Sequence, residues 1–303
     1  MVIGFGWLGS RGLGEPDETR YALVAQEMRA SGGWLVPTLH GAPHLTKPPL
    51  TYWSIALGQH LLGPGGWGSR LFLGVAFALT VLLVAQFGET LWADPRGRWA
   101  GVLYATTLTP FVAASLITTD TLLVLWETAA LLAFWRAWRA PTPAAARYWR
   151  VGAWSALGVA FLTKGPPGLL PLLLVLVYRW LRPCEEPAPR LLSLPGLAAV
   201  AVIGLPWYAV LAAAYPGLVE HLLGYELYRR VFVGLERRHA EWLHPFVIYG
   251  PVLVAGALPW LLLVLVAPRR LLRLARRVRW RASPRARLLA VWTILPILVF
   301  TLA

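Results

Sequence analysis

The sequence contains little lysine, little acid and a single cysteine. Only two of its 28 strong bases are lysine, at Lys47 and Lys164, and the rest are arginine. The lone Cys184 excludes an intrachain disulfide and a thiolate metal site. Charged residues make up only 14% of the chain and hydrophobic residues 57%, with a net charge of +14. This balance excludes a disordered chain and argues strongly against an ordinary soluble domain.

The sequence contains long apolar runs with few charged residues, and these runs predict an all-α, multispanning membrane protein. About eight runs approach the length needed to cross roughly 30 Å of hydrocarbon. No signal peptide is predicted, because the segment Met1–Arg11 has neither a basic start nor a proper apolar stretch. The predicted spans are Leu71–Leu91, Trp99–Leu116, Thr121–Trp138, Val151–Leu162, Pro166–Trp180, Leu191–Ala214, Phe246–Val266 and Leu288–Ala303.

The arginines predict the orientation of these spans. They cluster in the loops after alternate spans. These loops are therefore predicted to lie on the cytoplasmic side. The run Arg269–Arg287 could suggest a nucleic-acid-binding arm, but its position between two spans favours a solvated loop. The positive charge is thus interpreted as a topology signal and as attraction to anionic inner-leaflet lipids, with no nucleic acid among the partners.

The outward side is predicted to hold the site. It comprises a first large loop, 1–70, a second, 215–245, and the short turns at Ser115–Asp120 and Lys164. Scattered surface acids are the alternative, but acids, bases and histidines gathered at one membrane face more often line a site. These segments carry all six histidines and nine of the fourteen acids: Glu15, Asp17, Glu18, Glu27, Asp120, Glu220, Glu226, Glu236 and Glu241.

A helix is predicted to begin in the first outward loop, at Glu15-Pro16-Asp17-Glu18-Thr19-Arg20. Proline precedes it, and acids fill its first turn, where the helix dipole favours negative charge. Asp17 could simply cap this helix. A cap does not require Arg20, however, which lies one turn further along on the same face as Asp17.

The two lysines lie in proline-flanked motifs, Thr46-Lys47-Pro48-Pro49 and Thr163-Lys164-Gly165-Pro166. A lysine ammonium is a compact point charge that suits a phosphate oxygen. The alternatives are chance, in a sequence that uses few lysines, and, for Lys164, a side chain that snorkels to the interface.

Several motifs in order resemble bacterial polyprenyl-phosphate-sugar glycosyltransferases, the group of the aminoarabinose transferase, related to the protein O-mannosyltransferases. The resemblance covers essentially the whole chain. The first outward loop carries Pro-Asp-Glu-Thr-Arg-Tyr-Ala, Gly-Gly-Trp-Leu-Val-Pro and Lys-Pro-Pro-Leu-Thr-Tyr-Trp. The later motifs are Thr119-Asp120, Leu162-Thr163-Lys164-Gly165-Pro166, Leu205-Pro206-Trp207-Tyr208, Glu226-Leu227-Tyr228-Arg229-Arg230, and His239 through Pro245-Phe246 to Gly256-Ala257-Leu258-Pro259-Trp260.

This resemblance implies a C-type membrane glycosyltransferase fold with a partly helical, catalytic first periplasmic loop. It implies transfer of a sugar from a polyprenyl-phosphate donor to a periplasmic lipid, protein or glycan, in the inner membrane. Asp17 would be the catalytic carboxylate, with Glu18 beside it in the same motif. Arg20, Lys47, Lys164, Arg230 and Tyr52 would lie near the donor phosphate, and Asp120, Arg229, His239 and His244 are further site candidates.

The chemistry of the residues agrees with these roles. Cations neutralise a phosphate as the glycosidic bond breaks, and a carboxylate takes the acceptor's proton. A retaining enzyme would need a second carboxylate as nucleophile, and Glu18 is poorly placed because adjacent helical residues do not face each other. Inversion is therefore predicted.

A divalent metal is left open as a cofactor. Family members often have an acid before the lysine, implicated in metal binding in the aminoarabinose transferase, but this chain has Thr46. Asp17, His44, His239 and His244 could still supply oxygen and imidazole ligands. The alternative is that these histidines donate hydrogen bonds to phosphate or lipid headgroups.

The family pattern also predicts that residues 1–303 form a single transmembrane domain of a longer protein. The first span would be partly missing, and later spans and a soluble domain would be absent. Two other functional classes remain: a lipid or solute transporter, and a non-catalytic polyprenyl-phosphate-binding protein. A transporter should show inverted repeats or ionisable groups near span centres, and only Glu89 and Glu127 lie inside the predicted spans.

Overall fold

A computed structural model describes residues 2–182, 190–217, 244–269 and 283–302. The chain forms two compact units. The first comprises Met1–Val175 with Pro187–Trp207, and the second comprises Leu176–Glu186 with Tyr208–Ala303. The predicted arrangement of a single domain with two large outward loops stays a prediction.

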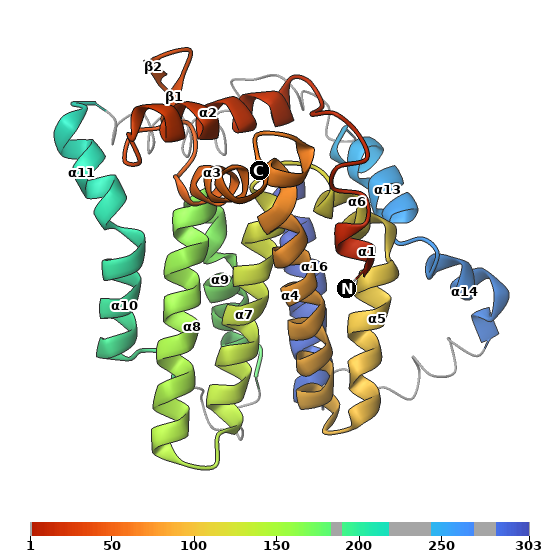
Figure 1. Ribbon diagram of the computed structural model, residues 1–303. Coiled ribbons are helices and arrows are strands. Elements are labelled where there is room, and N and C mark those ends of the chain that lie inside the picture. The colour runs from red at the N-terminus through yellow and green to blue at the C-terminus, as the bar shows by residue number, and fades with distance from the viewer. Residues whose placement is uncertain (1, 183–189, 218–243, 270–282, 303) are drawn as a thin grey trace. The chain divides into compact units, whose positions relative to one another are not determined.

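Upright helices form the body of the first unit (Figure 1). They are α4 (Gly66–Trp92), α7 (Asp120–Arg139), α8 (Pro143–Lys164) and α10 (Leu194–Gly204). α7 packs against α4 and α8, and α8 also packs against α10. The 27 residues of α4 make a helix of roughly 40 Å, which exceeds the thickness of a hydrocarbon core.

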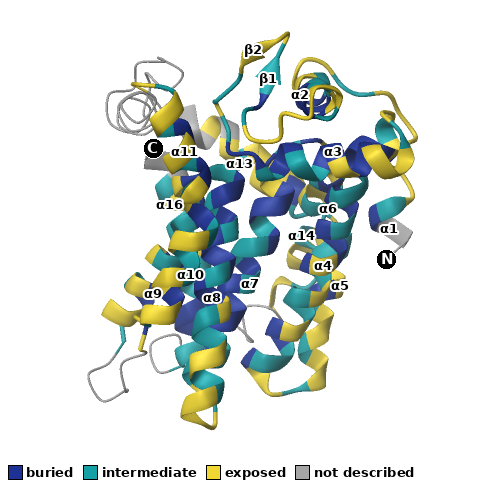
Figure 2. Cartoon of the chain, turned by 60° about the vertical axis from the view of Figure 1, so that its left-hand side comes forward, coloured by how far each residue is buried: buried dark blue, intermediate teal, exposed yellow. Residues whose placement is uncertain are grey.

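Two further helices, α2 (Asp17–Ser31) and α3 (Leu50–Leu62), lie across one end of the upright helices. Figure 2 shows that the inner faces of these helices are buried. α3 can approach α4 closely at Gly58 because glycine has no side chain. A Cβ at this position would lie only 2.2 Å from the carbonyl oxygen of Gly68. The shared core holds α2 and α3 on the end of α4 and α7, and it contains Tyr21, Val24, Ala25, Met28, Tyr52, Ile55, Ala56, Leu73, Ala76, Ile117, Leu122 and Leu125.

A short antiparallel hairpin, β1 (Thr38–Leu39) with β2 (Ala42–Pro43), follows α2. His40 and Gly41 have φ values of 53° and 75° and form its turn. The carboxylate of Glu27 accepts hydrogen bonds from the Thr38 hydroxyl at 2.6 Å and from the backbone N–H groups of His40 and Gly41 at 2.7 and 3.2 Å. These bonds, the Thr38 bond foremost, lower the pKa of Glu27 and fasten the hairpin to α2.

The other elements connect or extend these helices. In the first unit α1, η1, α5 and α6 surround α4, and η2 follows α8. α9 and α11 continue from the first unit into the second, which also contains α13, α14 and α16. Their bounds are α1 Val2–Phe5, η1 Pro95–Arg98, α5 Trp99–Thr106, α6 Leu108–Ala114, η2 Pro166–Leu169, α9 Leu170–Trp180, α11 Pro206–Ala214, α13 His244–Gly256, α14 Leu261–Val266 and α16 Pro284–Leu302.

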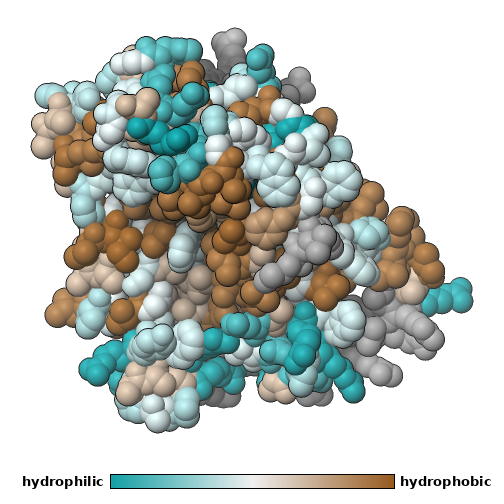
Figure 3. Space-filling model, in the orientation of Figure 1, coloured by the Kyte–Doolittle hydropathy of each residue, from teal (hydrophilic) through white to brown (hydrophobic). Residues whose placement is uncertain are grey.

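All eight predicted spans fall on a helix or on consecutive helices, which confirms their helical character. Within the described residues, only Gly66–Trp92 is by itself long and apolar enough to cross a membrane, and the pair Leu194–Gly204 and Pro206–Ala214 would be a second if its 45° bend lies within one span. Figure 3 shows hydrophobic surface over the middle of the upright helices and hydrophilic surface at their ends. That banding matches a helix bundle surrounded by lipid.

Candidate active site

Asp17 opens α2 and turns its carboxylate outward. The residue before it, Pro16, makes no side-chain cap, and no described backbone N–H donates to Asp17. Its Oδ1 instead accepts a hydrogen bond from Arg20 Nη2 at 2.6 Å, and 64% of the Asp17 side chain is exposed. The structure therefore pairs the predicted catalytic carboxylate with the predicted cation one turn along the same helix.

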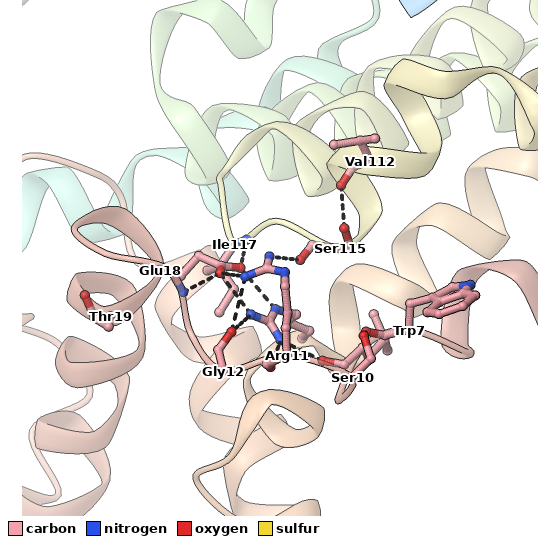
Figure 4. A network of polar contacts seen from close by, with 12 residues as sticks. Trp7, Ser10, Arg11, Gly12, Glu18, Thr19, Val112, Ser115 and Ile117 are labelled. Atoms are coloured by element: carbon pink, nitrogen blue, oxygen red, sulfur yellow. Dashed lines mark hydrogen bonds and ion pairs between the residues drawn. The ribbon is translucent and has the colours of Figure 1, made fainter. Parts of the chain in front are cut away.

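Glu18 points the opposite way, into a buried polar network (Figure 4). Its Oε1 accepts hydrogen bonds from Arg70 Nε at 3.0 Å and from the Ile117 N–H at 2.9 Å. Its Oε2 accepts from Arg70 Nη2 at 2.9 Å, Arg11 Nη1 at 2.5 Å and the Gly14 N–H at 2.7 Å. Burial opposes its charge, but these donors outweigh burial and lower the pKa of Glu18 to about 2.

Arg70 completes this network and is fully buried. It donates further hydrogen bonds to the carbonyl oxygens of Leu8, Arg11 and Gly12 at 2.7, 3.2 and 2.8 Å. Arg11 Nη2 in turn donates to the Ser115 carbonyl at 2.8 Å, just before α7. The network thus joins the start of α2 to α4 and to the loop that leads to Asp120.

Asp120 and Lys164, 44 residues apart in the sequence, form an ion pair between Oδ1 and Nζ. Asp120 is the first residue of α7, and Lys164 is the last of α8. Antiparallel packing of the two helices brings these ends together. Lys164 is therefore held by a carboxylate at the end of the bundle where α7 begins and α8 ends.

The pKa of Tyr21 responds to members of both ion pairs. Burial raises its pKa, the charge of Arg20 lowers it, and the charges of Asp120 and Asp17 raise it further. These effects require all three charges to lie close to one ring. The Arg20 guanidinium carbon lies 5.9 Å from the centroid of the Tyr21 ring, Asp17 and Asp120 also act on this ring electrostatically, and Lys164 is paired with Asp120. We refer to Asp17, Arg20, Asp120 and Lys164 as the candidate cluster.

The segment that carries Lys47 borders the same cluster. The pKa of His44 is lowered by burial and then by the positive charges of Arg20 and Lys47. His44 Nε2 lies 3.0 Å from Thr46 Oγ1, and the His44 ring lies edge-on to the Tyr52 ring with a centroid distance of 6.4 Å. Tyr52 is buried, with its ring 5.4 Å from that of Tyr21, and burial raises its pKa.

Several predicted site residues are not brought to this cluster by the described chain. Arg229, Arg230 and His239 lie outside the described residues. His244 begins α13 in the second unit. The roles predicted for these four residues stay predictions.

The donor set for a metal is incomplete in the part of the chain that the structure describes, where no three His, Cys, Asp or Glu side chains converge. Asp17 is paired with Arg20, and His44 is paired with Thr46, which stands where family members often have an acid. These residues do not fit a divalent ion by themselves, and His239 lies outside the described residues.

Arg70 and Arg11 were missed by sequence reasoning. Arg70 stands directly before the apolar run Leu71–Leu91, where an arginine normally reads as the polar end of a span. The available signal was that Arg70 stands at the end of that run opposite Arg96 and Arg98, away from the loops that are rich in arginine.

Comparison with known proteins identifies the family. Residues 8–222, more than half of the chain, match the model of the family described as dolichyl-phosphate-mannose-protein mannosyltransferase. The chain belongs to this family.

Bacterial proteins related to the chain carry more specific names. It is 34% identical over 308 residues to the undecaprenyl phosphate-alpha-4-amino-4-deoxy-L-arabinose arabinosyl transferase 1 of Pseudomonas fluorescens, covering 98% of this chain and 51% of that protein. It is also 34% identical over 319 residues to the corresponding transferase of Pseudomonas aeruginosa, covering 100% of this chain and 54% of the relative. The chain thus spans about half the length of these relatives.

Solved structures of the family confirm the predicted fold class. The crystal structure of ArnT from Cupriavidus metallidurans bound to undecaprenyl phosphate matches with a TM-score of 0.83 and 27% identity, covering 100% of this chain and 54% of that one. The apo crystal structure matches with a TM-score of 0.83 and 28% identity, covering 53% of that chain. The chain therefore has the mainly helical C-type glycosyltransferase fold of these structures.

Proposed function

We propose that the chain carries the active site of a membrane glycosyltransferase that transfers a sugar from a polyprenyl phosphate to a periplasmic lipid, protein or glycan. The observation that carries this proposal is the exposed Asp17–Arg20 ion pair, with Arg20 and Lys47 both acting on His44 and with Asp17, Arg20 and the partner of Lys164, Asp120, all acting on Tyr21. A carboxylate surrounded by cations suits a reaction that takes a proton from an acceptor and releases a phosphate.

In the proposed step, Asp17 accepts the proton of the acceptor hydroxyl. The acceptor oxygen forms a bond with the anomeric carbon as the bond from that carbon to the phosphate oxygen breaks. Its electron pair leaves with the polyprenyl phosphate, whose negative charge Arg20, Lys47 and Lys164 neutralise. Asp17 is the best-placed base because its carboxylate is the most exposed of the two acids in α2's first turn.

Inversion follows from the surroundings of the neighbouring carboxylate. A retaining enzyme needs a second free carboxylate about 5 Å from the first. Glu18 accepts five hydrogen bonds inside the fold and cannot reach a sugar on the outer face. Asp120 is engaged by Lys164. We therefore propose a single displacement with inversion.

The decisive test is transfer by the full-length protein. It should be incubated with a panel of polyprenyl-phosphate sugars and a membrane extract, including the 4-amino-4-deoxy-L-arabinose donor named for its relatives. Labelled sugar is expected in a lipid, protein or glycan fraction, with release of polyprenyl phosphate. Absence of transfer from every donor in the panel would contradict the proposal.

Lys47 and Lys164 are expected to act on one phosphate. Replacing either by Met should weaken donor binding by roughly tenfold or more, because a charged hydrogen bond contributes about 1.5–3 kcal/mol. The double variant should lose less than the sum of the single losses, since both groups contact the same anion. Donor affinity of the two single variants and the double variant, measured by calorimetry, checks this prediction.

Arginine replacements provide the control. Lys164→Arg should restore donor binding only in part, because a planar fork cannot reproduce a point contact. If Lys164 only snorkels to the interface, Lys164→Arg would change neither donor affinity nor stability. Lys164→Met would then lower stability without changing donor affinity. Small, strictly additive losses in the Met series would count against a shared phosphate.

The proposed orientation makes a separate prediction. Cysteines introduced at Thr38 and Gly234 should react with an impermeant thiol reagent added outside intact cells, whereas cysteines at Thr142 and Ser283 should not. Gly234 lies outside the described residues, while Thr38 lies in the hairpin beside the candidate active site and Thr142 lies in the α7–α8 turn. Labelling in the reverse pattern would place the active site on the cytoplasmic side.

A further inference from the structure

A group of arginines lies at the end of the α7–α8 hairpin that is remote from the candidate active site. α7 starts at Asp120 and α8 ends at Lys164, so the opposite ends of both helices meet in the turn around Thr142. The 20 residues of α7 put roughly 30 Å between the two ends. The members of this group, the remote arginine cluster, are Arg136, Arg139, Arg147 and Arg150.

Among the described residues, the remote arginine cluster has no acidic counterpart. The sequence contains no aspartate or glutamate between Glu127 and Glu185. In the described part of the chain, none of the four arginines forms an ion pair. At the same end of the bundle, by contrast, Arg98 is paired with Glu89 at 2.9 Å. Four neighbouring positive charges repel one another, so an external anion would stabilise this end.

Two of these guanidinium groups are held by aromatic rings. Arg136 Cζ lies 4.6 Å from the ring centroid of Trp149, and Arg139 Cζ lies 4.9 Å from that of Trp135. Stacking fixes the plane of a guanidinium and leaves its N–H edge available. Arg150 adds a buried Nε that has no hydrogen-bond partner among the described residues. Fixed N–H edges without a carboxylate suit phosphate oxygens.

An apolar stripe leads away from Arg136 along α4. Arg136 Nη2 donates to Gln86 Oε1 at 3.3 Å. Leu82 and Leu79 precede Gln86 by one and two turns on the same face, and their side chains are 45% and 44% exposed. A phosphate bound by the arginines would therefore have a hydrophobic surface beside it, as the acyl chain of a lipid requires. Free phosphate would leave that stripe uncovered.

We propose that the remote arginine cluster binds the headgroup of an anionic phospholipid, with an acyl chain along Leu82 and Leu79. The site lies in the leaflet opposite the candidate active site. It involves neither the donor nor the acceptor of the proposed reaction, so its test is independent of the proposed function. Trp149 and the buried Trp135 act as platforms that fix the guanidinium planes of Arg136 and Arg139.

Lipid titration of the full-length protein in neutral detergent tests the proposal. Phosphatidylglycerol or phosphatidylcholine is added, and bound lipid is counted by native mass spectrometry. The variant R136Q/R139Q removes two arginines of the cluster. The control variant R96Q/R98Q removes two arginines from the same end of the bundle, outside the cluster, with the same change of charge. A third variant, Trp149→Leu, removes one platform and no charge.

The proposal predicts that phosphatidylglycerol binds the wild type in preference to phosphatidylcholine. R136Q/R139Q should weaken phosphatidylglycerol binding by roughly tenfold to a hundredfold, the effect of losing a charged hydrogen bond. Trp149→Leu should weaken it by a smaller factor, and R96Q/R98Q should leave it within about twofold. Equal losses in both double variants would show diffuse attraction and overturn the site. Displacement of the lipid by millimolar inorganic phosphate would overturn the assignment to a phospholipid.

Discussion

Asp17→Asn in the full-length protein is expected to lower turnover by roughly a hundredfold or more, because loss of a general base typically has this effect. Donor affinity should change little, since the substitution keeps the shape of the side chain and leaves Arg20, Lys47 and Lys164 in place. Steady-state transfer rates and donor binding, measured on the same preparation, separate the two effects. The asparagine cannot accept the acceptor's proton, so kcat should carry the loss.

Glu15 provides the matched control. It is an exposed acid two residues before Asp17, and it has no described hydrogen bond or ion pair. Glu15→Gln removes the same charge from the same loop and should leave turnover within about twofold. Normal turnover in Asp17→Asn, or an equal loss in both variants, would remove Asp17 from the catalytic role.

The second large effect is expected on stability. Removing one partner of a buried ion pair costs about 3–5 kcal/mol, because the other charge stays buried without its counterpart. Glu18→Gln and Arg70→Gln should each destabilise the protein by an amount of this order. In the ion pair Glu89–Arg98, at the other end of α4, both side chains are exposed to solvent. Glu89→Gln should therefore lower the free energy of unfolding by only about 0–1 kcal/mol. Unfolding in micelles, followed by intrinsic fluorescence, compares the three variants.

The lowered pKa of Glu18 adds a pH dependence to this prediction. Its pKa falls from 4.5 to about 2 in the folded state. The unfolded chain therefore binds the proton first, and the contribution of Glu18 to stability is complete above pH 4.5 and is lost as the pH falls toward 2. Glu18→Gln should lack this part of the acid response. An unchanged acid response in the variant would show that other carboxylates dominate.

The helices were predictable because a helix in lipid satisfies its backbone hydrogen bonds internally and presents apolar side chains to its surroundings. That requirement leaves a long hydrophobic run in the sequence, as at Leu71–Leu91, whatever the neighbours are. The placement of α2 and α3 across the end of the bundle was not predictable. It depends on close contacts such as Gly58 against Gly68, and no run of apolar residues encodes them.

The candidate site was predictable where its partners are local. Asp17 and Arg20 lie one helical turn apart, so spacing alone places them on one face. The partner of Lys164 was not predictable, because Asp120 reaches it only through the antiparallel packing of α7 on α8. Arg70 was missed for the same reason, since its acceptor Glu18 lies 52 residues away.

The first turn of α2 gives two chemically similar neighbours opposite surroundings, with 64% of the Asp17 side chain exposed and only 5% of the Glu18 side chain. A helix rotates by about 100° per residue, so the residue at which α2 begins decides which acid faces outward. Exchanging the two acids would preserve composition, net charge and helix propensity. It would nevertheless turn a longer carboxylate toward the exposed face of α2 and leave a shorter one to bind Arg70. Rotational phase is therefore as much a part of this site as the presence of the carboxylates.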